Sequence, residues 1–258
     1  MFDHLTPEKL FSLKGKCALV TGAAGGIASG VVYAFAAAGA RLILADRNES
    51  VQERADFLEQ SGVETCALVF DVTDPEAVTR AVNDAAEKWG RLDILVNNAA
   101  VIGRKPFLDL TLEEWREVID TDLSGYFMVA QQAASRMAVQ GAGRIINIGS
   151  IMGHVSRPML VPYVSAKGAV HAFTRAVAAD LAGTGITVNA IAPGYTETEF
   201  SQANVKEFHT FVSDWTPVRR WGKPDDIAGA ALLLASEAGS FINGQVIYVD
   251  GGFTAVTK

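Results

Sequence analysis

The sequence has few residues from which a disulfide framework or a metal centre could be built. Its 258 residues include only two cysteines and four histidines. The cysteines, Cys17 and Cys66, both lie in apolar strand-like runs, so we expect buried free thiols in a reducing compartment. The histidines form no cluster with the spacing of metal ligands, and we expect no metal. They are His4, His154, His171 and His209.

Long apolar stretches and an excess of basic residues are also missing. The longest candidate, Val31–Ala40, falls well short of the roughly 18 residues that a membrane-spanning helix needs. The first ten residues lack the basic and apolar regions of a secretory signal. Lysine and arginine number 22 against 29 aspartate and glutamate, which gives a formal net charge of −7. Neither nucleic acid nor an anionic membrane is therefore an expected partner, and we expect a cytoplasmic protein.

What the chain does contain is a regular alternation of short apolar runs and longer helical patterns. The expected strands are Lys16–Thr21, Arg41–Ala45, Glu64–Phe70, Leu92–Asn97, Arg144–Gly149, Ile186–Ile191 and Gln245–Val249. The expected helices are Ile27–Ala38, Ser50–Gln60, Pro75–Trp89, Leu112–Val139, Tyr163–Leu181 and Pro224–Leu234. This pattern predicts one α/β domain with a doubly wound parallel sheet. Ligands of such sheets bind at the carboxyl ends of the strands.

A glycine-rich turn follows the first expected strand and opens the first helix. Gly22 and Gly26 let the backbone approach a pyrophosphate, and Ile27 begins a helix whose N-terminus favours negative charge. Asp46 ends the second strand, 20 residues beyond Gly26. A carboxylate there suits the ribose hydroxyls of NAD and repels the extra phosphate of NADP, although the neighbouring Arg47 leaves NADP possible. The alternative is an ordinary tight turn.

Polar residues also follow the next two strands. Asp71 and Val72 end the third strand, and Asn98 follows the fourth. Residues of this kind can simply cap the next element. Their place on the edge where a dinucleotide would lie favours contacts with its adenine and ribose.

Three residues near the middle of the chain suit proton transfer to or from oxygen. Tyr163 and Lys167 are four residues apart, which places both side chains on one helical face. A cation beside a phenol favours the phenolate, and the Ser150 hydroxyl could hold a reacting oxygen. The alternative is that Tyr163 and Lys167 merely begin an amphipathic helix.

Taken together, the motifs resemble the short-chain dehydrogenase/reductase family over nearly the whole length. They are TGAAGGIA at 21–28, Asp46, DV at 71–72, NNAA at 97–100, Ser150, YVSAK at 163–167, PGYTET at 193–198 and VDGG at 249–252. The resemblance implies a single Rossmann-type domain over 1–258 with about seven parallel strands. It also implies a homotetramer or homodimer, with the 112–139 and 163–181 helices at interfaces.

The resemblance assigns a role to each motif. Tyr163 would be the general acid/base, Lys167 would lower the pKa of that tyrosine and bind the nicotinamide ribose, and Ser150 would orient the substrate oxygen. The implied cofactor contacts are Gly22, Gly26, Ile27, Asp46, Asp71, Val72, Asn98, Tyr163, Lys167, Thr196 and Thr198.

The chain departs from the family pattern at three positions. Ala28 and Ala100 replace glycines, and Asp122 stands where the family has a catalytic-site asparagine. An aspartate keeps the backbone role of that residue in the proton relay but adds a negative charge near Lys167. We expect the substitution to be tolerated.

Several segments look closest to the gluconate 5-dehydrogenase branch, which handles sugar acids and polyols. A guanidinium at Arg104 could grip a carboxylate, and His154 and Arg157 lie in the loop between Ser150 and Tyr163. We expect all three to bind substrate, although each could be a solvated loop residue. The 199–221 segment, with Phe200, Phe208, Phe211 and Trp215, is expected to form a lid, unless these rings only dock the segment on the body.

The sequence therefore predicts an NAD-dependent oxidoreductase that interconverts a secondary alcohol and a ketone on a small polar substrate, a sugar acid or polyol. NADP is the less expected cofactor. The alternatives are a 3-oxoacyl thioester reductase or another ketone reductase of the family, and a non-catalytic NAD-binding sensor or scaffold.

Overall fold

A seven-stranded parallel sheet forms the centre of the molecule. The computed structural model describes residues 5–256, except the side chains of residues 200 and 202–207. The strands are β1 (Cys17–Thr21), β2 (Arg41–Asp46), β3 (Thr65–Val69), β4 (Ile94–Asn97), β5 (Gly143–Ile148), β6 (Ile186–Pro193) and β7 (Val246–Val249). Their order across the sheet is β3-β2-β1-β4-β5-β6-β7, and every pairing is parallel. The strand order reverses between β1 and β4, and doubly wound sheets bind their ligands at this point.

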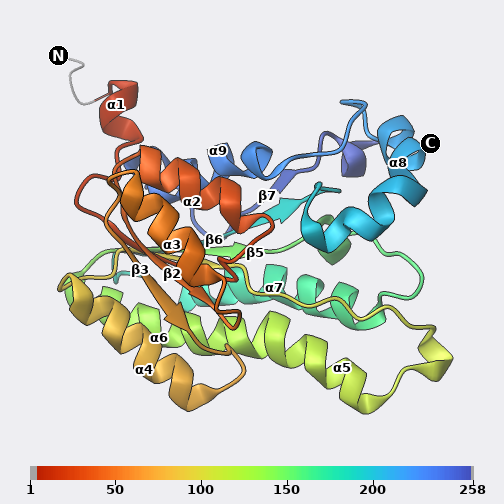
Figure 1. The fold of residues 1–258 in the computed structure, drawn as a ribbon, viewed down its shortest axis with the longest axis horizontal. Coiled ribbons are helices and arrows are strands. Elements are labelled where there is room, and N and C mark those ends of the chain that lie inside the picture. The colour runs from red at the N-terminus through yellow and green to blue at the C-terminus, as the bar shows by residue number, and fades with distance from the viewer. Residues whose placement is uncertain (1–4, 257–258) are drawn as a thin grey trace.

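Helices cover both faces of the sheet (Figure 1). One face carries α2 (Ala28–Ala37), α3 (Val51–Gln60) and α9 (Pro224–Ala235), and the other carries α4 (Pro75–Lys88), α6 (Gly125–Gln140) and α7 (Val161–Asp180). The remaining helices are α1 (Pro7–Leu10), α5 (Leu112–Ile119) and α8 (Gln202–Trp215). Short 3-10 turns occupy Phe107–Asp109, Ile151–Gly153, Glu199–Ser201, Glu237–Gly239 and Phe253–Ala255. This arrangement confirms the predicted fold class.

The two faces of the sheet have separate apolar cores. All five residues of β1 are buried, because its side chains alternate between the two cores. Val20 packs with the residues of α2 and α9, whereas Leu19 packs with those of α4 and α6. Burial on both faces explains why this strand is apolar almost throughout.

Helices α2 and α9 cross at a glycine. A Cβ atom on Gly30 would collide with the backbone carbonyl of Pro224, the first residue of α9. The close approach of these helices brings the chain that precedes α9 next to the turn between β1 and α2.

The structure differs from the predicted elements in several places, among them the short helix α1, which was not predicted. The predicted Leu112–Val139 helix is divided by a π-helical turn at Asp120–Ser124, a feature that often occurs at functional sites. Strand β6 continues to Pro193, and the expected lid contains a 14-residue helix, α8. Other element boundaries agree to within about two residues.

Two further predictions concern the burial of the cysteines and the presence of membrane-spanning helices. Cys17 is buried as expected, whereas Cys66 lies half-buried on the outer strand β3, and both thiols are free. Among residues 5–256, no helix combines the length and apolar character that crossing a membrane requires.

Candidate active site

A cavity of about 440 Å³ opens at the carboxyl ends of the strands. Its walls come from the segments that follow β1, β2, β3, β4, β5 and β6, so residues far apart in sequence meet there. Except for Asp122 and His154, every site residue named from the sequence lines this cavity.

The glycine turn forms one end of the cavity, and Asn98 holds it in place. The Asn98 side chain donates to the carbonyl oxygens of Thr21 and Gly22, both at 3.0 Å. Gly22 has φ +63°, and a Cβ atom there would lie 2.8 Å from the Cα of Ala99. Only glycine suits this conformation and this close approach. The turn leads into the N-terminus of α2, where unpaired N–H groups favour an anion.

The Asp46 carboxylate ties the end of β2 to the glycine turn. Oδ2 accepts from the backbone N–H of Ala24 at 3.0 Å, and Oδ1 accepts from that of Asn48 at 2.9 Å. Arg47 is exposed and lines the same part of the cavity. Asp46 therefore has a local structural role in addition to any contact with a ligand.

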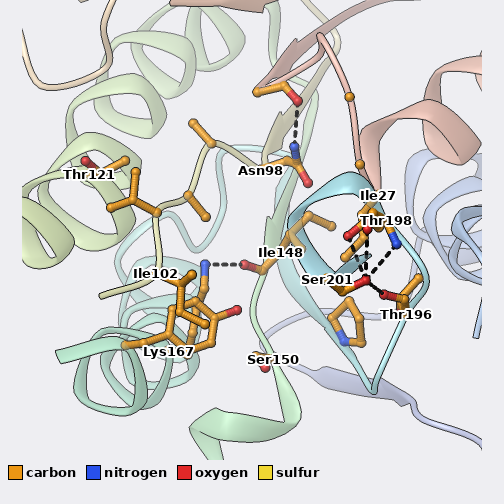
Figure 2. A pocket seen from close by; sticks show the side chains of 18 of the residues that line it. Ile27, Asn98, Ile102, Thr121, Ile148, Ser150, Lys167, Thr196, Thr198 and Ser201 are labelled. Atoms are coloured by element: carbon orange, nitrogen blue, oxygen red, sulfur yellow. Dashed lines mark hydrogen bonds between the residues drawn. The ribbon is translucent and has the colours of Figure 1, made fainter. Parts of the chain in front are cut away.

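The segment after β6 closes the opposite wall around Ser201 (Figure 2). Ser201 Oγ donates to the carbonyl oxygen of Thr196 at 2.8 Å and accepts from the backbone N–H of Thr198 at 2.8 Å. Asp71 and Val72 line the cavity from the other side of the sheet's switch point, and the Asp71 carboxylate accepts from Thr73. A glycine cradle, a helix N-terminus and flanking polar side chains fit a dinucleotide.

Ser150, Tyr163 and Lys167 lie together at the deeper end of the cavity. Ser150 follows β5, its Oγ accepts from the Met152 N–H at 3.1 Å, and its hydroxyl lowers the pKa of Tyr163. The Lys167 ammonium lies 5.6 Å from the centre of the Tyr163 ring. It donates to the Ile148 carbonyl oxygen at 3.1 Å (Figure 2). The carboxyl end of β5 and the first turns of α7 thus bring the three predicted residues together.

Asp122 lies behind this group and does not line the cavity. It belongs to the π-helical turn and is completely buried. Oδ1 accepts from the Val101 N–H at 2.8 Å, and Oδ2 lies 3.2 Å from Lys167 Nζ. The carboxylate therefore joins the chain after β4 to the lysine of α7.

Tyr126 is a member of this group that the sequence did not reveal. Its hydroxyl donates to the Ile148 carbonyl oxygen at 3.0 Å and accepts from Lys167 at 3.3 Å, and the residue is 1 % exposed. One signal was available: Tyr126 follows Asp122 by four residues, a spacing that places both on one helical face.

Burial has the largest effect on the pKa values of Tyr163 and Tyr126. It raises the pKa of Tyr163 above its usual value, and Asp122 raises it further, while Lys167, Ser150 and Arg104 lower it. Lys167 lowers the pKa of Tyr163, as the sequence led us to expect, but burial outweighs this effect and the net direction is upward. Burial likewise raises the pKa of Tyr126 to about 12.

The pKa values of Asp122 and Lys167 depend on their burial and on each other's charge. Burial raises the pKa of Asp122, against the effect of Lys167 and the Val101 N–H. Burial alone would lower the pKa of Lys167, yet Asp122 and the two tyrosines hold it above its ordinary value. The lysine is therefore a stable cation at neutral pH.

Arg104 and Arg157 both line the cavity, but His154 does not. The exposed His154 ring lies beside Tyr248 of β7, with ring centroids 5.7 Å apart. The backbone after Ser150 forms a 3-10 turn that carries His154 away from the cavity, which corrects its predicted place at the substrate.

Helix α8 packs aromatic side chains beside Arg157. Phe211 and Trp215 lie with ring centroids 5.8 Å apart, and Trp215 lies 6.0 Å from Phe253 near the C-terminus. The Arg157 guanidinium rests on the Phe208 ring at 3.9 Å. A second cavity, of about 400 Å³, lies under these rings and shares Arg157 with the first. The expected lid residue Phe200 has a side chain outside the described ones.

Two further histidines, His171 and His209, lie within the described part of the chain. His171 is buried against the backbone of the Ser150 loop, and His209 is exposed. Among the described residues, which exclude His4, no group of three or more histidine, cysteine, aspartate or glutamate side chains could hold a metal ion.

The chain matches known enzymes over nearly its whole length. Residues 22–254 match the family model described as enoyl-(acyl carrier protein) reductase. Gluconate 5-dehydrogenase of Gluconobacter oxydans is 40% identical over 248 residues, which cover 95% of this chain and 97% of the relative. Galactitol 2-dehydrogenase (L-tagatose-forming) of Cereibacter sphaeroides is 43% identical over 251 residues, with the same coverage.

A solved structure is equally similar. The gluconate 5-dehydrogenase of Burkholderia cenocepacia, in complex with NADP and tartrate, has a TM-score of 0.94 and 38% sequence identity, and the match covers 98% of this chain and all of that one. A relative that carries NADP does not support the expectation that NADP is the less favoured cofactor. Fold, motifs and relatives agree, and this chain belongs to the short-chain dehydrogenase/reductase family.

Proposed function

We propose that this protein is an oxidoreductase that interconverts a secondary alcohol and a ketone on a sugar acid, sugar or polyol. The observation that carries the proposal is one cavity that contains the glycine turn at one end and Ser150, Tyr163 and Lys167 at the other, with Arg104 beside them. Relatives named for gluconate and galactitol support the substrate class.

In this proposal a nicotinamide dinucleotide binds along the cavity and carries the hydride, whereas residues of the chain transfer the proton. The dinucleotide, when bound, supplies or accepts the hydride. The Ser150 hydroxyl orients the substrate oxygen, and Tyr163 gives that oxygen a proton in reduction or takes one in oxidation. Lys167 supplies positive charge behind the tyrosine.

Either NAD or NADP is compatible with the cofactor end. Asp46 presents a carboxylate where a ribose would lie, and two of its acceptor positions already bind backbone N–H groups. Arg47 lines the same wall and suits a phosphate. We propose that the protein uses a nicotinamide dinucleotide, with Asp46 favouring NAD and Arg47 favouring NADP.

Two arginines suit the substrate end. Arg104 and Arg157 approach the cavity from different loops, and each guanidinium can bind a carboxylate through two hydrogen bonds. Residues 199–221, which include α8, form a lid over this end, and Arg157 links the Ser150 loop to that lid through Phe208.

The assembly and the location follow the family. We propose a cytoplasmic homotetramer or homodimer in which α6 and α7 lie at interfaces. The exposed Phe127 and Val139 of α6 fit such a contact. Light scattering after size exclusion would measure the assembly.

The decisive experiment is a dehydrogenase assay with NAD and with NADP over sugar acids, polyols and deoxy-keto acids. We expect turnover with at least one sugar acid or polyol and its loss in Tyr163→Phe, with dinucleotide binding retained. Turnover with 3-oxoacyl thioesters alone would favour the acyl reductase, the activity named for a relative from Vibrio cholerae. Dinucleotide binding without any turnover would favour a sensor.

A further inference from the structure

His171 lies one helical turn beyond Lys167, on the face of α7 that also carries Tyr163. The residue is 5 % exposed, and its Nε2 atom has no hydrogen-bond partner among the described residues. A buried polar atom without a partner is uncommon and calls for an explanation. The chemistry proposed above gives His171 no part, so the contacts of its ring must supply that explanation.

The ring packs against two glycines that flank Ser150, and residues 149–153 are called the Ser150 turn below. A Cβ atom on Gly149 would lie 2.6 Å from His171 Nε2, and one on Gly153 would lie 2.6 Å from His171 Cε1. Closely packed atoms do not approach so far, so the imidazole fits here because both positions are glycine. Tyr248 of β7 also contacts the imidazole, with ring centroids 6.1 Å apart at 82°.

Hydrogen bonds connect these glycines to Ser150 and to the sheet. The Gly153 N–H donates to the Ser150 carbonyl oxygen at 2.9 Å, and the Gly149 N–H donates to the Ile191 carbonyl oxygen of β6 at 2.7 Å. Ser150 therefore lies between two points of the backbone that His171 contacts. A shift of either glycine would move the serine with it.

We propose that His171 is a positioning residue that holds the Ser150 turn at a fixed distance from α7 and so sets Ser150 against Tyr163. Tyr163 and His171 belong to one helix, and a ring of fixed size between that helix and the turn keeps the serine hydroxyl in place relative to the phenol. His171 does not line the cavity, so it acts through Ser150. This inference rests on the proposed function and adds the residue that supports its serine.

Turnover is the first test. His171→Ala leaves space beside the Ser150 turn, and because small displacements of reacting groups are costly, we expect kcat to fall roughly 10- to 100-fold. The Kd for NAD or NADP, measured by fluorescence titration, should stay at the wild-type value. Arg175→Ala, exposed one turn further along α7, is the control and should keep its kcat. An unchanged kcat in His171→Ala overturns the proposal, and so does a loss of dinucleotide affinity as large as the loss in kcat.

The size of the side chain should matter more than its polarity. Because Nε2 makes no hydrogen bond, His171→Leu fills much of the same space and is expected to retain most of the wild-type kcat. If His171→Leu loses as much turnover as His171→Ala, an imidazole nitrogen is required and positioning by shape is wrong.

The glycine that faces the ring offers a second-site test. In Gly149→Ala the new Cβ would meet His171 Nε2 at 2.6 Å, whereas the nearest backbone atom, the Ile191 carbonyl oxygen, lies at 3.4 Å. We therefore expect Gly149→Ala to lower kcat in the wild type and to cause no further loss in His171→Ala. Gly153→Ala is the control, since its Cβ would also lie 2.7 Å from the Lys167 carbonyl oxygen and should lower kcat in both backgrounds. Equal losses from Gly149→Ala in both backgrounds overturn the proposal.

Amide hydrogen exchange provides a readout that needs no substrate. In His171→Ala, exchange should become about tenfold faster in residues 149–155 and stay unchanged in the glycine turn at 22–27. A uniform change in both segments, or no change in 149–155, overturns the proposal. If His171→Ala does not fold, Gly149→Ala still crowds the ring, and normal turnover with normal exchange in that variant is equally decisive. If the wild type turns over no sugar acid or polyol, the proposed function fails, whereas the exchange still decides whether His171 holds the Ser150 turn.

Discussion

The Asp122 carboxylate lies 3.2 Å from the Lys167 ammonium, with both side chains buried behind the active-site cavity. Each residue compensates a charge that would otherwise be costly to bury. A buried pair of this kind contributes little net stability as a whole, whereas the loss of one partner leaves an isolated charge. The pair therefore links the stability of the domain to the charge at the site.

Removing the carboxylate should destabilise the protein. Asp122→Ala loses both the partner of Lys167 and the acceptor for the Val101 N–H, and we expect the free energy of unfolding to fall by about 3–5 kcal/mol. Asp122→Asn keeps an acceptor and should lose less. Denaturant unfolding at neutral pH measures both, with the exposed Asp120→Ala as control. Equal losses in Asp122→Ala and Asp120→Ala would contradict a buried ion pair.

Arg104 should discriminate between substrates that have a carboxylate and those that do not. A charge-assisted hydrogen bond contributes about 1.5–3 kcal/mol, so Arg104→Ala is expected to raise KM for a sugar acid by roughly 10- to 100-fold. KM for a polyol of the same length should change little. Arg104→Lys keeps the charge but not the two-pronged geometry, and should be intermediate. If KM rises equally for the acid and the polyol, Arg104 does not bind the carboxylate.

Substitutions of Asp46 and Arg47 should shift the preference between NAD and NADP in opposite directions. Asp46→Asn removes the charge that repels a ribose phosphate while keeping an acceptor for a backbone N–H, so relative kcat/KM for NADP should rise about tenfold. Arg47→Ala should lower it. The exposed Glu49→Gln is a control for charge alone. An unchanged NADP-to-NAD ratio in both variants would place the selectivity elsewhere.

The sequence predicted those parts of the site that repeating local patterns determine. The strand–helix alternation predicted the sheet, and the residues at strand ends, such as Asp46 and Ser150, lie at the cavity. Spacing within one helix placed Tyr163 and Lys167 together. These features depend on contacts between residues close in sequence or on the general rule for parallel sheets.

The features that were missed depend on tertiary packing. The sequence predicted Asp122 near Lys167, but it did not predict the π-helical turn at Asp120–Ser124 or the contact of Tyr126 with Lys167, because no periodic pattern marks such a turn. The upward direction of the Tyr163 pKa depends on how deeply the phenol is buried, which sequence does not reveal. His154 was misplaced because its loop bends toward Tyr248.

Acid should destabilise the protein through His171. The residue is 5 % exposed, and burial lowers its pKa from 6.5 to about 4. Because the folded pKa is depressed, the unfolded chain binds the proton first, and stability falls as pH drops from 6.5 to about 4. The shift corresponds to about 3 kcal/mol. His171→Gln should therefore lose less stability than wild type between neutral pH and pH 4, whereas the exposed His209→Gln should behave as wild type. Denaturant unfolding at both pH values measures this difference, and equal losses in all three proteins would show that His171 is protonated in the folded state.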